Sequence, residues 1–342
     1  MTHGTQPDGP GETRAVIGVG KARIPRRGLL FASAGGALSG LVGASRADAR
    51  APRLNTLAPA FHRFTMGEAE ITVVSDGVIV AGDPTKSFRG APAADIASLM
   101  SGSFLPTDRI VFDENVVVVS TGSRVTLFDT GSGSVQAFGP GAGRLLANLD
   151  AAGIRPSDVD AVVLTHGHAD HICGVMNDGR IVFENARFCI NQVDHDFWLD
   201  TGKAGGPLKL FHEQAVLNLV PIRDRLTFIK DGQEILPGIQ AKLVPGHTPG
   251  HMAFMITSGD KTVALIADAA RHHILNVEAP RLEFVGDIDP AKCVETRIKL
   301  FEMLVSANIP VMSYHYPFPG IGHLARWGDR YRYYPSSWLS GI

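Results

Sequence analysis

The sequence predicts a mixed α/β (α+β) fold in which two β-sheets pack face to face between layers of helices. Two β-rich halves indicate this arrangement, because each combines short apolar strands with segments of helical spacing. The histidine-bearing loops follow directly after apolar runs, which places them at strand ends, where such folds carry their chemistry. With 342 residues, 44% of them hydrophobic, the chain is long enough to bury a sizeable core.

The first half predicts strands around a turn at Asp76-Gly77, then a Val-rich hairpin, a helix that ends at Gly153, and a short apolar strand. The corresponding ranges are 69–80, 114–131, 143–153 and 159–165.

The second half predicts a strand that runs into another histidine-bearing loop, a hairpin, an amphipathic helix and a last apolar strand. The corresponding ranges are 238–251, 252–268, 289–307 and 309–315. The hairpin turns at 258–260, and the helix begins with Asp289 as a cap and Pro290 in its first turn.

Residues 1–49 are not expected to belong to this fold. Arg26 and Arg27 precede a mildly apolar Ala/Gly/Leu segment that ends at Ala47-Asp48-Ala49, which is the three-part layout of a cleaved export signal. The paired arginines resemble a bacterial twin-arginine signal, and a basic tail is the alternative. We therefore expect residues 50–342 to form the catalytic domain, located in the periplasm or outside the cell.

Composition excludes several classes of function. The formal net charge is −2 and no basic cluster is present, which argues against nucleic acid as a partner. No run of about 20 apolar residues predicts a membrane span in the mature form. Three scattered cysteines are too few for a disulfide scaffold, although one bridge remains open.

The stretch LTHGHADH at 164–171 predicts a metal site. Neutral imidazoles and carboxylates are good ligands for zinc-like ions. His166 and His168 lie two apart, so that in an extended loop both rings point the same way, and Asp170 and His171 follow where the loop enters a helix. The alternative, a solvated histidine-rich loop, fits this crowding poorly.

Four ligands on so short an arc cannot all reach one ion in good geometry, but two adjacent ions could share them. Each ion then needs one or two more ligands. Three candidates lie at other strand ends: His247, Asp268 and His315. Taken alone, each of them is more typical of an ordinary loop or turn residue.

The motifs THGHADH, PGHTPGH, ADA and SYH together resemble the metallo-β-lactamase superfamily over roughly residues 60–340. The resemblance implies an αββα sandwich with two divalent ions at one edge of the sheets. It implies that His166, His168 and His247 bind one ion, that Asp170, His171 and His315 bind the second, and that Asp268 bridges them. It also implies that Asp129 orients a ligand loop and that His251 braces one.

Within the superfamily, FPGIGHLARWGDRYRYYP at 318–335 and the segment before the histidine cluster resemble methyl parathion hydrolase and its relatives. Those are exported dinuclear hydrolases of organophosphate triesters, aryl esters and lactones, and the resemblance also suggests a homodimer. It implies that Phe138, Phe197 and Trp198 line the substrate pocket, with core packing as the alternative. Cys173 and a short 172–184 segment depart from these relatives, which leaves the substrate less defined than the metal site.

The expected chemistry is hydrolysis of a small ester-type substrate by a metal-bridging hydroxide. Metals lower the pKa of bound water from ~15.7 to about 7. Two dications, Asp170, Asp268 and hydroxide sum to about +1, which favours the anionic transition state. Asp170 is also a candidate proton donor. Zinc is expected, with Mn, Co or Fe as alternatives.

Other functions stay open. An acyl-homoserine lactonase or a β-lactamase would use the same fold, and the missing cysteine ligand argues against the latter. A non-catalytic metal-binding scaffold is a more remote alternative.

Overall fold

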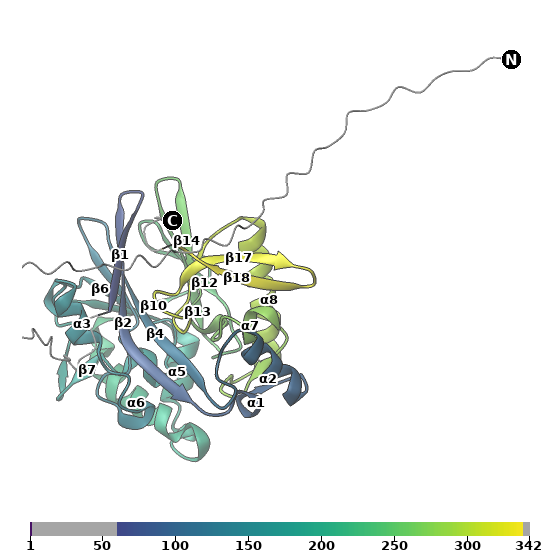
Figure 1. Cartoon of the computed structure of the whole chain (residues 1–342). Helices are drawn as coiled ribbons and strands as arrows, with labels where there is room; N and C mark the ends of the chain where they lie inside the picture. Colours follow the sequence, from purple (N-terminus) through teal and green to yellow (C-terminus); the bar gives the residue numbers. More distant parts are fainter. Residues whose placement is uncertain (2–59, 338–342) are drawn as a thin grey trace, which may run out of the picture. The chain divides into compact units, whose positions relative to one another are not determined.

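A computed structural model describes Met1 and residues 60–337 (Figure 1). The expected export segment, with Arg26, Arg27 and 47–49, lies outside the described residues. Residues 60–337 fall within a single compact unit. Among its helices, none combines the length and apolarity needed to cross a bilayer.

Two sheets of seven strands form the centre of this unit. The first sheet has the order β1-β2-β4-β5-β6-β9-β10, and its strands β5, β6, β9 and β10 run parallel. Its bounds are β1 Phe61–Met66, β2 Ala69–Ala81, β4 Ile110–Ser120, β5 Val125–Phe128, β6 Ala161–Val163, β9 Arg187–Asn191 and β10 Leu226–Ile229.

The second sheet has the order β11-β12-β13-β14-β16-β17-β18. Its bounds are β11 Glu234–Leu236, β12 Ile239–Leu243, β13 Met252–Ser258, β14 Lys261–Leu265, β16 Val311–Met312, β17 Ile321–Trp327 and β18 Arg330–Pro335. Two short two-stranded sheets complete the set: β3 Phe88–Arg89 with β15 Glu283–Phe284, and β7 Met176–Asn177 with β8 Arg180–Ile181.

The helices cover the outer faces of the sheets. Helices α3, α5 and α6 pack on the first sheet and α8 packs on the second. The bounds are α1 Pro84–Ser87, α2 Ala93–Gly102, α3 Leu145–Ala151, α4 Ala169–Ile172, α5 Gln192–Leu199, α6 Lys209–Leu219, α7 Leu275–Glu278 and α8 Pro290–Ser306. As expected, Asp289 caps α8 with its side chain and Pro290 stands in its first turn.

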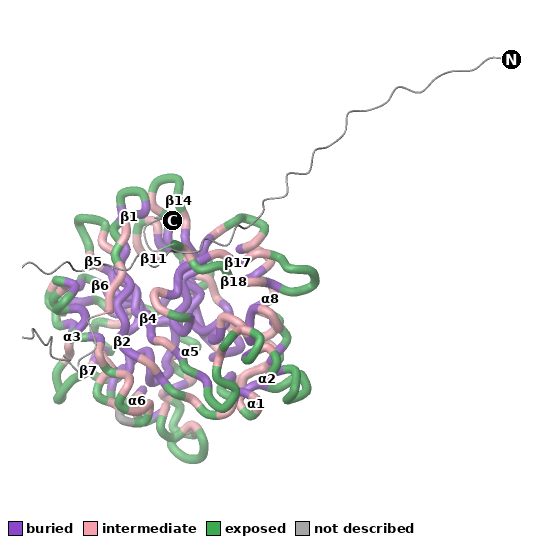
Figure 2. Tube along the Cα trace, viewed as in Figure 1, coloured by how far each residue is buried: buried purple, intermediate pink, exposed green. Residues whose placement is uncertain are grey.

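The Val-rich run in β4 shows how the layers form. Val116 and Val118 face the helices, whereas Val117 and Val119 face the second sheet, where Phe254 and Ile256 also contribute to the core. Because both faces of the central strands are covered, neighbouring valines are all buried (Figure 2). This confirms the predicted αββα sandwich.

One expectation about the strands was wrong. The residues around Asp76-Gly77 do not form a turn but a bulge within the single strand β2, where the register against β4 shifts between Ser75 and Gly77. Gly77 has a φ of +113°, and a Cβ there would lie 2.0 Å from the Gly141 carbonyl oxygen. A bulge and a turn both need a residue that can adopt a positive φ, so an Asp-Gly pair is compatible with either one.

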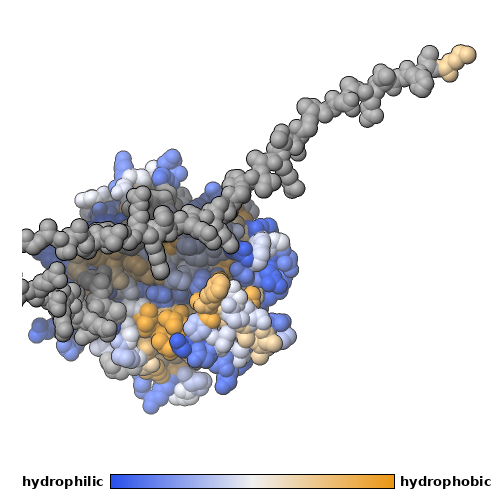
Figure 3. Space-filling model, in the orientation of Figure 1, coloured by the Kyte–Doolittle hydropathy of each residue, from blue (hydrophilic) through white to orange (hydrophobic). Residues whose placement is uncertain are grey.

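Beyond the bulge, β2 and β4 continue as a ribbon with one exposed face. Val80 and its cross-strand partner Val111 are 59% and 42% exposed. On the face drawn in Figure 3, apolar surface gathers over these two strands. The hairpins β4–β5 and β13–β14 and the helix α3 lie where the sequence predicts them.

Candidate metal centre

The histidine cluster lies where β6 ends and α4 begins. The backbone is extended at His168, which is the residue before the first turn of α4, and this four-residue helix carries Asp170 and His171. His166, His168, Asp170 and His171 are all buried. The loop therefore turns four ligand-type side chains into the protein rather than towards solvent.

Three imidazoles form the first group. His168 Nδ1 lies 3.0 Å from His166 Nε2 and 2.8 Å from His247 Nε2. His247 comes from the loop after β12, in the second sheet. Burial lowers the pKa of His166 and of His168 well below the usual value, so both rings are neutral, the form that binds a metal.

The second group joins Asp170 and His171 to His315, which follows β16. His315 Nε2 lies 3.4 Å from Asp170 Oδ2. Two ligand atoms on a tetrahedral zinc ion with bonds of 2.0–2.1 Å are about 3.3 Å apart. The spacing in this group matches that requirement.

Asp268, which follows β14, lies between the two groups. Its Oδ2 is 3.2 Å from His247 Nε2 and 3.3 Å from His315 Nε2, and its Oδ1 is 3.3 Å from His171 Nε2. Burial alone would raise the pKa of Asp268, but His315, Arg271 and His171 outweigh it and hold the pKa well below the usual value. Asp268 is therefore a carboxylate that faces both groups. We call its side chain and the six others the cage: His166, His168, Asp170, His171, His247, Asp268 and His315.

Several cage atoms are orphaned. His171 Nε2, His315 Nε2 and both carboxylate oxygens of Asp268 are buried without a hydrogen-bond partner in the described part of the chain. Each such atom costs about 1–3 kcal/mol unless something satisfies it. Convergent imidazole nitrogens and carboxylate oxygens without partners are the donor set of a divalent metal ion, so these residues fit the implied ions.

Buried acceptors fix the far side of three rings. His171 Nδ1 donates to Asp129 Oδ2 at 2.8 Å, His247 Nδ1 to Asp287 Oδ1 at 2.8 Å, and His315 Nδ1 to the Asp113 carbonyl at 2.8 Å. Each bond turns the Nε2 of its ring towards the cage centre.

Asp129 also contacts the cluster loop, the segment that the resemblance expects it to orient. Its carboxylate accepts hydrogen bonds from the Thr165 backbone at 2.8 Å and the Thr165 hydroxyl at 2.9 Å. Burial disfavours the charged form of His171, but the carboxylates of Asp268, Asp129 and Asp170 outweigh burial and raise its pKa.

His251 connects two loops. Its Nε2 accepts a hydrogen bond from the Asp268 backbone at 3.0 Å, and its Nδ1 donates to the Val244 carbonyl at 3.2 Å. Both ring nitrogens of His251 therefore have hydrogen-bond partners on the backbone, and its bracing role stays a prediction.

The three aromatic residues expected around the substrate differ in position. Trp198 is fully buried, and its ring lies 5.0 Å from the His168 ring. A Cβ on Gly167 would meet Trp198 Cδ1 at 2.3 Å, so the indole fixes the back of the cluster loop. Phe138 and Phe197 are partly buried against the helix-side core. Contact of these rings with a substrate stays a prediction.

Sequence reasoning missed Asp194. From α5, its carboxylate accepts hydrogen bonds from the Gly167 backbone at 2.7 Å, from the Gly250 backbone at 3.0 Å and from the Thr248 hydroxyl. It thus ties together the loops that carry His166, His168 and His247. No local pattern marks it, because its partners are 27 to 56 residues away in the sequence.

Asp287, Arg271 and Tyr314 were also missed. Tyr314 donates to the Asp170 carbonyl at 2.8 Å, and its ring lies 4.0 Å from the His171 ring. Its position directly before His315 is the one sequence signal that could have found it.

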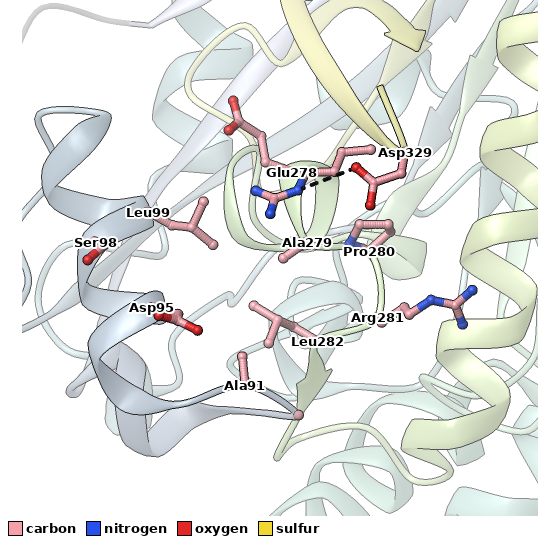
Figure 4. Close-up of a pocket in the computed structure, with 12 residues that line it drawn as sticks. Ala91, Asp95, Ser98, Leu99, Glu278, Ala279, Pro280, Arg281, Leu282 and Asp329 are labelled. Atoms are coloured by element: carbon pink, nitrogen blue, oxygen red, sulfur yellow. Dashed lines mark ion pairs between the residues drawn. The ribbon is translucent and has the colours of Figure 1, made fainter. Parts of the chain in front are cut away.

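A separate surface pocket of about 480 Å³ lies between α2 and residues 278–282 (Figure 4). Asp95, Glu278, Arg281 and Asp329 give it mixed charge. No cage residue lines this pocket, so it is distinct from the candidate metal centre.

Comparison with solved structures gives two close likenesses. A hydrolase of the beta lactamase superfamily, AbOPH, is 28% identical with a TM-score of 0.77, covering 82% of this chain and 99% of that one. AidC, a dizinc quorum-quenching lactonase, is 25% identical with a TM-score of 0.75, covering 82% of this chain and 98% of that one.

Among curated proteins, the N-acyl homoserine lactonase of Bacillus cereus is 24% identical over 37% of this chain, and that of Bacillus thuringiensis is 22% identical over 49%. The chain spans 45% and 60% of the lengths of these relatives. The family model of the metallo-beta-lactamase superfamily matches residues 109–292, which carry six of the seven cage residues. The chain belongs to the metallo-beta-lactamase superfamily.

Proposed function

We propose that the protein is a dinuclear, metal-dependent hydrolase of ester-type bonds, acting on a lactone, an aryl ester or an organophosphate triester. The position of Asp268 between two groups of ligand-type side chains carries this proposal. Lactones come first among the substrates, because the curated relatives are N-acyl homoserine lactonases and AidC is a dizinc lactonase. The finer likeness to methyl parathion hydrolase supports aryl esters and phosphotriesters as the second choice.

The proposed ligand assignment follows the distances. His166, His168 and His247 would hold one ion, Asp170, His171 and His315 would hold the other, and Asp268 would bind both. Zinc suits this nitrogen and carboxylate set best. When bound, two divalent ions supply water with a lowered pKa and an electrophile for the oxygen that gains negative charge.

The side chains of the chain supply position and charge. Asp129 and Asp287 hold His171 and His247 in the orientation that a ligand needs. Asp170 is buried, and its pKa lies well below the usual value: burial would raise it, but His171, His315 and Arg271 outweigh burial. It is therefore a carboxylate before reaction and a candidate to accept a proton from water and pass it to the leaving group.

The test is a side-by-side rate measurement on purified, zinc-loaded protein. The panel contains an N-acyl homoserine lactone, an aryl ester, a phosphotriester and a cephalosporin, each with and without chelator. We expect chelator-sensitive hydrolysis of at least one of the first three. Turnover confined to the cephalosporin would instead show a β-lactamase, and inert zinc-loaded protein would favour a metal-binding scaffold.

We further propose that residues 1–49 are a cleaved twin-arginine export signal and that residues 50–342 act in the periplasm or outside the cell as a homodimer. Amino-terminal sequencing of the exported protein should begin near residue 50. Replacing both Arg26 and Arg27 by Lys should retain the precursor in the cytoplasm, and export of that variant would refute the assignment.

A further inference from the structure

Arg271 carries a positive charge next to the cage, and it is not one of the proposed metal ligands. It follows Asp268 by three residues, and its side chain is only 10% exposed. Nη1 lies 2.9 Å from Asp268 Oδ2, and Nη2 lies 3.7 Å from Asp170 Oδ2. The guanidinium therefore faces the two carboxylates of the cage.

Two aromatic rings fix this guanidinium. Its central carbon lies 5.0 Å from the ring centre of Phe112 and 5.0 Å from that of Phe284. The Phe112 ring is in turn 5.3 Å from the His315 ring. The backbone N–H of Arg271 donates to Asn276 Oδ1 at 3.0 Å, which holds the segment itself. Cation–π contacts and this bond keep the side chain in one place.

One donor of this fixed group has no partner. The Nε–H of Arg271 is buried, and no acceptor for it occurs among residues 60–337. A buried orphan donor on a charged group is costly, and a nearby ligand is one way to satisfy it. The Nε–H and one Nη–H of a guanidinium point in parallel, which matches two oxygens on one carbon.

We propose that Arg271 anchors the acyl half of the substrate, so that the site selects carboxylic esters, lactones among them, whose hydrolysis leaves a carboxylate beside the cage. This inference rests on the proposed function. Hydroxide adds to the acyl carbon and the bond from that carbon to the ester oxygen breaks. The leaving alkoxide takes the proton that the hydroxide brought, so the products are one carboxylate and one alcohol. The parallel donors of Arg271 bind the acyl oxygen before the reaction and both carboxylate oxygens after it.

The formal charge supports the same choice. Two dications, Asp170, Asp268 and a hydroxide sum to about +1, and Arg271 raises this to about +2. A site with this excess attracts an anionic product and repels a cationic substrate.

The experiment measures product binding by calorimetry on zinc-loaded protein, using hexanoate and diethyl phosphate as probes. The variants are R271M, which removes the charge, and R271K, which keeps the charge without the fork. R281M is the matched control, because Arg281 is exposed and lines the separate pocket of Figure 4. Zinc content is measured for every variant, so that loss of metal is distinguished from loss of the anchor.

We expect R271M to weaken hexanoate binding by about 10- to 100-fold, with R271K between R271M and the wild type and R281M like the wild type. The diethyl phosphate probe tests the choice of substrate class, because a guanidinium fork can also pair with two phosphate oxygens. An equal or larger loss of diethyl phosphate affinity in R271M would overturn the selection of carboxylic esters. Wild-type hexanoate affinity in a zinc-loaded R271M variant would overturn the proposal, and wild-type affinity in R271K would overturn the role of the fork.

These outcomes are separate from the proposed function. If the wild type hydrolyses an ester and R271M keeps both its KM and its hexanoate affinity, the anchor fails and the hydrolase stands. If the zinc-loaded wild type is inert towards the whole panel, the hydrolase fails whatever Arg271 binds.

Discussion

The carboxylate of Asp268 lies between His171 and His247, 3.3 Å from Nε2 of the first and 3.2 Å from Nε2 of the second. His171 lies in α4, which follows β6 of the first sheet, and His247 lies in the loop after β12 of the second sheet, so this one side chain faces ligands from both halves of the sandwich. Its two oxygens are buried without a hydrogen-bond partner among the described residues, and Oδ2 forms an ion pair with Arg271 Nη1 at 2.9 Å.

Asp268→Asn should reduce kcat/KM by about 10²–10³-fold or more, because an amide is a poor bridge between two cations. The zinc content should fall from two ions per chain to one or fewer, while the circular dichroism spectrum stays near that of the wild type. Asp260→Asn, on the exposed turn between β13 and β14, is the control. Full zinc occupancy and turnover in Asp268→Asn would contradict the bridging role.

Zinc should stabilise the fold. A bound ion would give partners to the orphaned imidazole nitrogens of the cage, and an ion at 1,000 times its dissociation constant adds about 4 kcal/mol to the free energy of unfolding. Thermal melts with a zinc titration should show a rising midpoint that chelator reverses. A midpoint insensitive to zinc would argue that the cage does not bind it.

Asp194→Ala should destabilise the protein by about 3 kcal/mol, because it leaves buried backbone donors of two ligand loops unpaired. The zinc dissociation constant should rise as well, since His166, His168 and His247 lose their common support. Urea unfolding and zinc competition measure the two effects. Asp196→Ala, two residues on and exposed, should change neither quantity appreciably.

Gly167→Ala should impair the cage through Trp198 alone. The added methyl would lie 2.3 Å from Trp198 Cδ1, so the ring or the histidine loop must shift. We expect weaker zinc binding and lower turnover, partly restored when Trp198→Phe is added to relieve the contact. Gly205→Ala, where a Cβ meets nothing within 4 Å, is the control. An unchanged zinc affinity in Gly167→Ala would show that the loop tolerates the shift.

His273 should make stability depend on pH. Burial lowers its pKa to about 4 from the usual 6.5, so the unfolded chain binds a proton more readily than the folded one. Stability is therefore lost as pH falls from 6.5 to 4, and this group accounts for about 3 kcal/mol of the loss below pH 4. His273→Gln should reduce the difference in unfolding free energy between pH 7 and pH 4. Chelator in all samples removes the contribution of metal release, and an identical slope in His273→Gln would refute the prediction.

Much of the fold could be read from the sequence because its signals are local. The run of valines in β4 predicts a strand because of its high β-propensity. The turn residues at 258–260 predict the hairpin between β13 and β14. The seven cage residues were accessible too, because each stands directly after an apolar strand or within one tight motif. The bulge at Asp76-Gly77 was mistaken for a turn because both structures require the same backbone freedom at glycine.

The supporting residues could not be read in this way. Asp194 lies in helix α5, whose sequence contains no motif that marks this residue as functional. Asp287 and Arg271 lie in segments without a regular hydrophobic pattern. Their roles arise from partners brought near by packing: Asp287 meets His247 across 40 residues of chain. A sequence pattern locates groups that share a segment, whereas these contacts depend on how the segments are stacked.

The same dependence on packing reaches the core, where the rings of Phe128 and Phe254 meet across the sandwich with centroids 5.2 Å apart and planes tilted by 57°. Phe128 directly precedes Asp129, and Phe254 pairs with Leu265 on the strand that leads to Asp268. The volume of the hydrophobic core thus sets the distance between the two sheets, and with it the distance between the ligand residues that each sheet carries. Replacing Phe128 or Phe254 by a smaller or larger side chain would change the metal affinity, although neither residue is a ligand.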